Sequence, residues 1–278
     1  MNDIKIEICV DSVESCINAE KGGADRVELC GNLFEGGITP SFGILELAKE
    51  KINIPIYAMV RPRGGDFLYS EIEFEVMKRE IKTLKSLNID GIVFGILTKD
   101  GKVDKKRCSE LLDIWGEGKA VFHRALDVSR NLFESVEDII SIGGFERILT
   151  SGGEANVMSG IINLKEMIKR YNDKITVMPG GGINIDNIKY IKETTQAKEY
   201  HMAANKNFDS SMEYRNENVF MGGALRLPEF SVKITDENKV KEIIYGSFKI
   251  FFSDNRSRFN RLFIFICRLR NINESERI

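Results

Sequence analysis

Eight short apolar runs alternate with helical patterns along most of the chain, and this alternation restricts the possible fold more than any other feature. Each run is rich in β-branched residues and is followed by a polar turn. The runs cover residues 4–10, 26–30, 54–60, 91–97, 120–125, 147–150, 175–178 and 199–203. Strands that alternate with helices form a parallel sheet, and eight such units in 278 residues favour a closed barrel over an open sheet. We therefore predict the α/β class and the (β/α)8 architecture, the TIM barrel.

Helix-capping signals between the runs support this count. Ser70 and Glu73 form a capping box, and apolar residues follow it at helical spacing: Phe74, Met77, Ile81 and Leu84. Ser12 is expected to cap the first helix, which ends at the glycine pair 22–23. Another apolar helix face covers residues 132–140 and ends at glycines 143–144. Each of these segments connects two of the predicted strands.

We expect residues 1–245 to form a single barrel domain that includes a post-barrel segment, residues 205–245. Residues 205–229 are polar and show no clear period, so we predict no regular structure there. Such a stretch in a compact domain usually serves function or an oligomer contact. Residues 246–278 differ in composition, with Phe, Ile, Asn and Arg prominent. Either a loosely ordered tail or an amphipathic membrane anchor fits this composition, and we favour the tail.

The charge balance and the cysteines limit the class of protein. The formal net charge is −2, which argues against binding to nucleic acid or to a membrane surface. We expect no signal peptide and no membrane span, because no apolar run approaches roughly 18 residues. The five cysteines are unevenly spaced and include no CxxC pair: Cys9, Cys16, Cys30, Cys108 and Cys267. A disulfide framework or a zinc finger is therefore not expected, and we predict reduced thiols in the cytoplasm.

The first two strands turn polar side chains into the barrel. Side chains alternate along a strand, and a barrel strand presents one face to the helices and the other to the interior. The apolar faces of these strands should meet the helices. In the first strand the inward residues are then Glu7, Cys9 and Asp11. In the second strand they are Arg26, Glu28 and Cys30.

The two inward thiols allow two interpretations. Neighbouring strands lie about 4.7–4.9 Å apart, so Cys9 and Cys30 can both line the interior near the carboxyl ends of the strands. They can be small buried hydrophobic residues, as free cysteines often are. They can also form a soft-metal site, because thiolate is the ligand that selects Cu(I). The neighbouring carboxylates oppose thiol ionisation unless Arg26 or Arg61 offsets their charge.

The polar ends of several strands suggest an enzyme active site instead. In a TIM barrel the active site lies at the carboxyl ends of the strands. Arg61 follows the third strand, and His123 and His201 lie in strands near this level. In an enzyme the histidines would carry protons, although each can instead be a hydrogen-bonded core residue. The carboxylates that would act as acids, bases or hard-metal ligands are Glu7, Asp11 and Glu28.

A glycine-rich turn is a candidate anion-binding site. Gly180, Gly181 and Gly182 connect the seventh strand to a helix that we expect to begin at residues 183–184. Backbone N–H groups in such a loop, together with the helix dipole, can hold a phosphate or another anion. Arg63, in the polar segment after the third strand, would add positive charge. The alternative is a tight turn, which requires the same glycines.

Eight ordered sequence blocks carry a family resemblance. They cover residues 6–12, 23–30, 36–41, 61–67, 122–125, 146–152, 178–183 and 199–201, and include the strings IEICVDS, ADRVELC, RPRGGDF and MPGGGI. In this order the blocks resemble the signatures of the CutC family from about residue 4 to about residue 244. The resemblance is strongest to eukaryotic members, which also carry cysteines at the positions of Cys9 and Cys30.

The resemblance implies a cytoplasmic (β/α)8 barrel, commonly oligomeric and linked to copper tolerance and trafficking. In eukaryotic members, Cu(I) binding is attributed to thiols that match Cys9 and Cys30, and no reaction is established for the family. The chain departs from the family in two places. Residues 202–204 are Met-Ala-Ala, where the family often has Cys or Ser and then Ser-Ala. From about Tyr245 the family pattern ends.

Three hypotheses follow from these observations. In the first, the chain is a copper homeostasis protein that holds one Cu(I) between Cys9 and Cys30, in the cytoplasm or also the nucleus, as a homo-oligomer (a dimer or tetramer). In the second, it is a TIM-barrel enzyme that acts on a phosphorylated or carboxylated small molecule, with a divalent metal as a possible cofactor. In the third, it is an oligomeric scaffold without a working site.

Overall fold

Eight parallel strands form the barrel that the sequence predicts. The computed structural model describes residues 4–219, 221 and 229–248. The barrel strands are β1 (Lys5–Val10), β2 (Arg26–Leu29), β3 (Ile56–Met59), β4 (Gly91–Phe94), β5 (Lys119–Phe122), β6 (Phe145–Thr150), β7 (Thr176–Pro179) and β8 (Glu199–Met202). Each pairs in parallel with the next as far as β7, and β1 also pairs with β8. Between β7 and β8 a single parallel bridge joins Gly180 and His201. The TIM-barrel prediction is confirmed.

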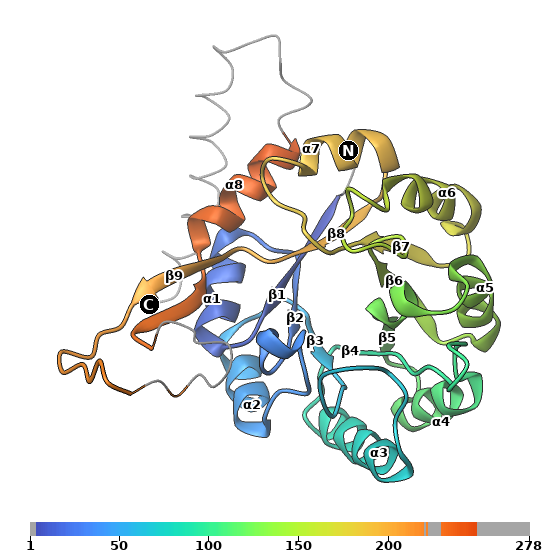
Figure 1. Cartoon of the computed structure of the whole chain (residues 1–278), viewed down its shortest axis with the longest axis horizontal. Helices are drawn as coiled ribbons and strands as arrows, with labels where there is room; N and C mark the ends of the chain where they lie inside the picture. The colour runs from blue at the N-terminus through green and yellow to red at the C-terminus, as the bar shows by residue number, and fades with distance from the viewer. Residues whose placement is uncertain (1–3, 220, 222–228, 249–278) are drawn as a thin grey trace, which may run out of the picture.

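Helices surround the strands on the outside (Figure 1). They are α1 (Val13–Gly22), α2 (Phe42–Lys51), α3 (Glu71–Ser86), α4 (Lys105–Trp115), α5 (Leu132–Ile142), α6 (Ile161–Tyr171), α7 (Ile188–Thr195) and α8 (Glu237–Phe248), with short 3-10 turns η1 (Leu33–Glu35) and η2 (Arg124–Val128). The capping box at Ser70 is present, and Ser12 caps α1. Gly23 ends α1 with a φ of 95°, a conformation that favours glycine. No helix in the described ranges is long and apolar enough to cross a membrane.

The core has two parts, one on each side of the strands. Between strands and helices lies a large apolar cluster that includes Ile6, Ile8 and Val10, so the outward face predicted for the first strand is confirmed. Cys16 and Cys108 belong to this cluster and are fully buried, as expected for structural residues. Inside the barrel lies a smaller cluster: Cys9, Cys30, Tyr57, Met59, Val93, Val121, Leu149 and Met178. The lumen is thus a filled core, as in other TIM barrels.

The segment after β8 differs from the sequence expectation. Residues 205–209 form β9 (Asn205–Asp209), which pairs antiparallel with β10 (Ser231–Thr235), and this ribbon extends beside α1 (Figure 1). The prediction of no regular structure is wrong for this strand. Sequence analysis missed it because nearly all of its side chains are exposed. A strand without a buried face shows no apolar alternation in its sequence.

Helix α8 completes the outer ring against α1 and α7. Val240 is fully buried, and a Cβ added to Gly22 would lie 2.4 Å from Val240 Cβ, so this glycine permits the close approach of the two helices. The domain boundary expected after residue 245 falls inside α8. Most of the expected tail, residues 249–278, lies outside the described residues, so its separation from the barrel stays a prediction.

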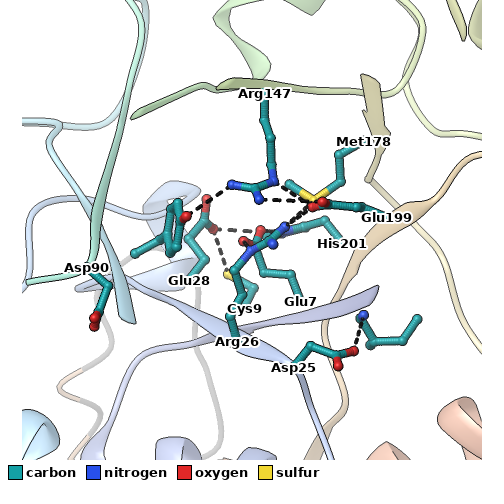
Figure 2. Close-up of polar contacts among 12 residues, drawn as sticks. Glu7, Cys9, Asp25, Arg26, Glu28, Asp90, Arg147, Met178, Glu199 and His201 are labelled. Carbon is teal, nitrogen blue, oxygen red and sulfur yellow. Dashed lines mark hydrogen bonds and ion pairs between the residues drawn. The ribbon is translucent and has the colours of Figure 1, made fainter. Parts of the chain in front are cut away.

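Buried ion pairs fill the lumen toward the amino ends of the strands. Arg26 donates hydrogen bonds to Glu7 and, at 2.6 Å, to Glu199, while Arg147 donates to Glu199 at 2.5 Å (Figure 2). The guanidinium carbons of Arg26 and Arg147 lie 5.2 and 5.3 Å from the centre of the Tyr57 ring. All of these side chains are buried. Buried charges are tolerated only when paired and hydrogen-bonded, and this set is paired throughout.

Removing Arg26 should destabilise the barrel strongly. Arg26→Met deletes one positive charge and leaves Glu7 and Glu199 buried with fewer partners, so we expect a loss of about 3–5 kcal/mol in the free energy of unfolding. Urea denaturation measures this loss. Arg79→Met is the control, because Arg79 pairs with Glu75 on the exposed surface of α3, and stability should stay unchanged within error. Equal stabilities for the two variants would show that the network is not required.

Candidate functional site

Two thiols and a carboxylate meet inside the barrel. β1 positions Cys9, and β2 positions Glu28 and Cys30, with Cys9 in register with Glu28. The Cys9 sulfur lies 3.3 Å from Glu28 Oε2 (Figure 2), and the Cys30 sulfur lies 3.6 Å from the same oxygen. The three ligand atoms all lie within 4.8 Å of one another. The inward orientation predicted for both cysteines is therefore observed.

A histidine adjoins this group from the last strand of the barrel. β8 pairs with β1 so that His201 lies in register with Glu7. Nδ1 of His201 is 2.7 Å from Glu7 Oε1, and its Nε2 is 3.7 Å from Glu28 Oε2. The ligand atoms of Glu7, Glu28 and His201 also lie within 4.8 Å of one another. Glu28 is thus shared between a sulfur-rich and an oxygen-and-nitrogen donor set.

The two thiols differ in their electrostatics. The hydrogen bond with Cys30 lowers the pKa of Cys9 to about 5, against the effect of burial and with help from His201. The same contact with Cys9, together with burial, raises the pKa of Cys30 above its usual range. Burial disfavours the charged form of His201, but Glu28, Cys9 and Glu7 outweigh it and raise the His201 pKa. The cluster therefore favours a thiolate on Cys9, the form that binds metals.

A cavity of about 210 Å³ opens above this cluster at the carboxyl ends of the strands. Six of its lining residues carry titratable or charged side chains: Cys9, Glu28, His201, Arg61, His123 and Arg124. The remaining lining residues are Leu33, Gly36, Met59, Phe67, Leu149 and Gly181. Cys30 is not part of the lining and is 1% exposed, whereas Cys9 is 9% exposed. A molecule in the cavity would therefore meet the sulfur of Cys9 first.

His123 lines the cavity and carries an unpaired ring nitrogen. Its Nδ1 accepts a hydrogen bond from the Ala125 backbone N–H at 3.2 Å, which places the remaining ring proton on Nε2. Burial and the charge of Arg61 lower the His123 pKa to about 3, so the ring is neutral near pH 7. Nε2 is buried, and no described residue accepts a hydrogen bond from it.

Arg61 carries a positive charge that no described carboxylate pairs with. Its guanidinium donates to the backbone carbonyls of Glu35 at 2.8 Å, Gly37 at 3.0 Å and Gly65 at 2.8 Å. These bonds fix its position without neutralising it. The side chain is buried, and its Nε has no partner among the described residues. A buried cation without a counter-ion attracts an anion.

Other predicted residues lie away from this site. Arg63 pairs with Asp66 at 3.0 Å and with Glu73 at 2.6 Å and does not border the cavity. Asp11 follows the end of β1, is only partly buried and is also outside the lining.

Of the three glycines, only Gly181 borders the cavity. Gly180 pairs with His201 in the bridge between β7 and β8, and a Cβ there would clash with Leu149 at 2.4 Å. Gly182 lies next to Asn156 instead. The helix expected at residues 183–184 begins later, at Ile188, because Asn184 and the residues after it form a hydrogen-bonded turn first. The helix N-terminus is thus separated from the glycine turn by this turn.

Some site residues were missed by sequence reasoning. The alternation applied to the first two strands would have placed Tyr57 and Met59 inward on β3. Arg124 had no such signal, because the 3-10 turn η2 directs it to the cavity and Asp127 holds it there at 2.7 Å. Such a turn is not visible as a sequence period.

Comparisons with known proteins agree with this architecture. The CutC family model matches residues 4–206. A human protein named copper homeostasis protein cutC homolog is 46% identical over 242 residues, covering 87% of this chain and 88% of the relative. A Dictyostelium discoideum protein of the same name is 43% identical over 273 residues, covering 88% of this chain and 98% of the relative.

Solved structures show the same fold. A CutC structure from Streptococcus agalactiae superposes with a TM-score of 0.68 at 33% identity, covering 72% of this chain and 98% of that one. Phosphoribosyl anthranilate isomerase from Thermotoga maritima superposes with a TM-score of 0.54 at 11% identity, covering 89% of this chain and 100% of that one, which shows the shared barrel alone. With a matching family model over most of its length and relatives above 40% identity, the chain belongs to the CutC family.

Proposed function

We propose that the protein acts in copper homeostasis and binds one Cu(I) per subunit through Cys9 and Cys30. The observation that carries the proposal is the placement of two thiols and Glu28 within 4.8 Å of one another in the lumen. Thiolates are soft ligands that select Cu(I) over hard ions such as Mg²⁺. The relatives named for copper homeostasis support the same role.

The surroundings of the thiols support this assignment. The pKa of Cys9 is lowered, so a thiolate is available near pH 7, and the cavity gives an ion access to its sulfur. Cys30 lies behind it, where a Cβ on Gly37 would come within 2.9 Å of Cys30 Sγ. The four described cysteines are all free and buried, which agrees with reduced thiols in the cytoplasm or nucleus.

A second candidate function is an enzyme acting on an anionic small molecule. The observation that favours it is the presence of Arg61, the neutral His123, Glu28 and His201 in the lining of one cavity. His201 would move a proton, with Glu7 orienting it at 2.7 Å. Glu7, Glu28 and His201 would prefer a divalent ion to Cu(I). Of the glycine turn, only Gly181 is placed to contact such a substrate.

The copper site predicts a specific effect of removing either thiol. Cys9→Ser and Cys30→Ser each leave one soft ligand, so Cu(I) affinity should fall at least about tenfold and stoichiometric binding should be lost. Anaerobic titration under reducing conditions, with a chromogenic Cu(I) chelator as competitor, measures both quantities.

The control for this experiment is Cys108→Ala. Cys108 is buried in the apolar layer under α4, away from the lumen, so this variant should bind one Cu(I) like the wild type. Undiminished stoichiometry in both serine variants would end the assignment. Thermal unfolding of every variant confirms that folded proteins are compared.

The enzyme candidate predicts stabilisation by an anionic ligand. A phosphorylated or carboxylated metabolite at about 100 times its dissociation constant should stabilise the protein by ~2.7 kcal/mol, which corresponds to a melting-temperature rise of about 5 °C or more. Thermal-shift screening of such metabolites, with and without Mg²⁺ or Mn²⁺, tests this expectation. His123→Phe removes the Nε2 donor and should reduce the shift. A broad screen without any stabilising ligand would count against an enzyme.

We also propose that the protein is a homo-oligomer, a dimer or a tetramer. The ribbon and the segment after β9 expose several large apolar side chains: Phe208, Met212, Tyr214 and Val232. Contiguous apolar patches on a protein surface often mark an interface. The ribbon extends beyond the barrel, where it can reach a second copy (Figure 1).

Charged substitutions on this segment should dissociate the assembly. Light scattering coupled to size exclusion should give a dimer or tetramer for the wild type, and Met212→Asp with Tyr214→Asp should shift it toward the monomer. Ile72→Asp is the matched control, because Ile72 is 80% exposed on α3, away from the ribbon (Figure 1). A wild-type monomer at all concentrations, or an unchanged mass in the double variant, would contradict the prediction.

A further inference from the structure

The sulfur of Cys9 and a set of positive or donating groups border the same small cavity. Its volume of about 210 Å³ lies below the range of drug-sized ligand pockets, which suits a small organic acid. The lining includes Cys9, the accessible ligand of the candidate copper site. It also includes Arg61, His123 and Arg124.

Arg61, His123 and Arg124 are suited to a carboxylate. Arg61 supplies a buried charge that no described carboxylate neutralises, and His123 carries a buried Nε2–H with no hydrogen-bond partner among the described residues. Arg124 lies against the backbone of Gly181, since a Cβ there would come within 3.1 Å of its Cζ. Asp127 and Ser151 hold Arg124 in this place, at 2.7 and 2.8 Å. Charge-assisted hydrogen bonds from such groups are about twice as strong as neutral ones.

Copper needs a route to the sulfur of Cys9. In a reducing compartment, Cu(I) is held by soft sulfur ligands, so it reaches Cys9 already bound to another thiol. Any such thiol must enter through the cavity, because Cys30 is buried behind Cys9 and does not border the opening. A carrier that also has a carboxylate would contact both the sulfur of Cys9 and the positively charged residues of the lining.

We propose that the cavity binds a small mercaptocarboxylic acid and exchanges Cu(I) with it. The carboxylate of this carrier lies between Arg61, His123 and Arg124, and its sulfur lies next to Cys9. The inference rests on the proposed Cu(I) site at Cys9 and Cys30. It adds the chemical class of the copper donor or acceptor.

The exchange is a ligand substitution in which no electron is transferred. Copper is first bonded to the carrier's thiolate. Bonds then form from copper to Cys9 Sγ and Cys30 Sγ, and the bond to the carrier's sulfur breaks. Copper remains Cu(I) throughout. Cys9 enters as the thiolate, and the proton that Cys30 loses leaves on the carrier's sulfur.

Binding of the carrier to the copper-free protein is the first test, with mercaptosuccinate as the probe. Titration calorimetry should show saturable binding to the wild type, and Arg124→Gln should weaken it about tenfold, or ~1.4 kcal/mol. Arg124→Lys keeps the charge and should weaken it less. Arg63→Gln is the matched control, because Arg63 lies outside the cavity and should leave binding unchanged. Equal affinities of Arg124→Gln and wild type would overturn the proposal.

Copper transfer is the second test. The rate of Cu(I) transfer from its mercaptosuccinate complex should saturate with complex concentration, and succinate should inhibit it competitively in the wild type. Transfer from a mercaptoethanol complex, which has no carboxylate, should not saturate and should not respond to succinate. A linear rate that succinate leaves unchanged overturns the proposal, as does inhibition by inorganic phosphate but not by succinate.

The two tests separate this proposal from the copper assignment. If Cys9→Ser and Cys30→Ser keep wild-type Cu(I) binding, the copper site itself is wrong and the exchange fails with it, whatever mercaptosuccinate does. If both serine variants lose copper but mercaptosuccinate does not bind, the copper site stands and the carrier is wrong.

Discussion

The ion pair between Arg26 and its two carboxylates holds together the part of the barrel with the fewest backbone hydrogen bonds. β7 and β8 share only one bridge, between Gly180 and His201. Arg26 on β2 contacts Glu7 on β1 and Glu199 on β8, and Arg147 on β6 reaches across β7 to the same Glu199. Charged side chains therefore connect the strands on both sides of the single bridge between β7 and β8. Because these charges are buried, each depends on the others to remain in place.

The same network positions the candidate site. Glu7 uses one oxygen for Arg26 and the other for His201 Nδ1, at 2.7 Å. This contact fixes the His201 ring and directs Nε2 toward Glu28. Burial raises the pKa of Glu7, but Arg26 and His201 outweigh it and hold the pKa at about 2, so Glu7 remains a carboxylate that can orient the histidine. Cys9 is thus connected to the buried ion pairs through Glu28, His201 and Glu7, which Figure 2 shows in a single view.

The sequence predicted the barrel and the inward side chains because both depend on local periods. Alternation along β1 and β2 places the inward residues of those strands, except that Asp11 lies beyond the end of β1, and caps define the helices between them. The exposed strand at residues 205–209 was missed because it buries no face and so has no period. Arg63 and Arg124 follow different strands and look alike in sequence, yet only Arg124 borders the cavity. Their positions depend on loop contacts, such as that of Arg124 with Asp127, which no local pattern encodes.

The overlap of two donor sets at Glu28 bears on which metal the lumen favours. A hard divalent ion would use Glu7, Glu28 and His201, but Glu7 is already bonded to Arg26 and to His201 Nδ1. Binding such an ion would place its charge near a buried guanidinium and compete for an occupied carboxylate. Neither sulfur forms a described contact with a guanidinium, and a monovalent ion held by two thiolates leaves a net negative charge that the nearby His201 can offset. Electrostatics and ligand softness therefore both support the proposed Cu(I) site.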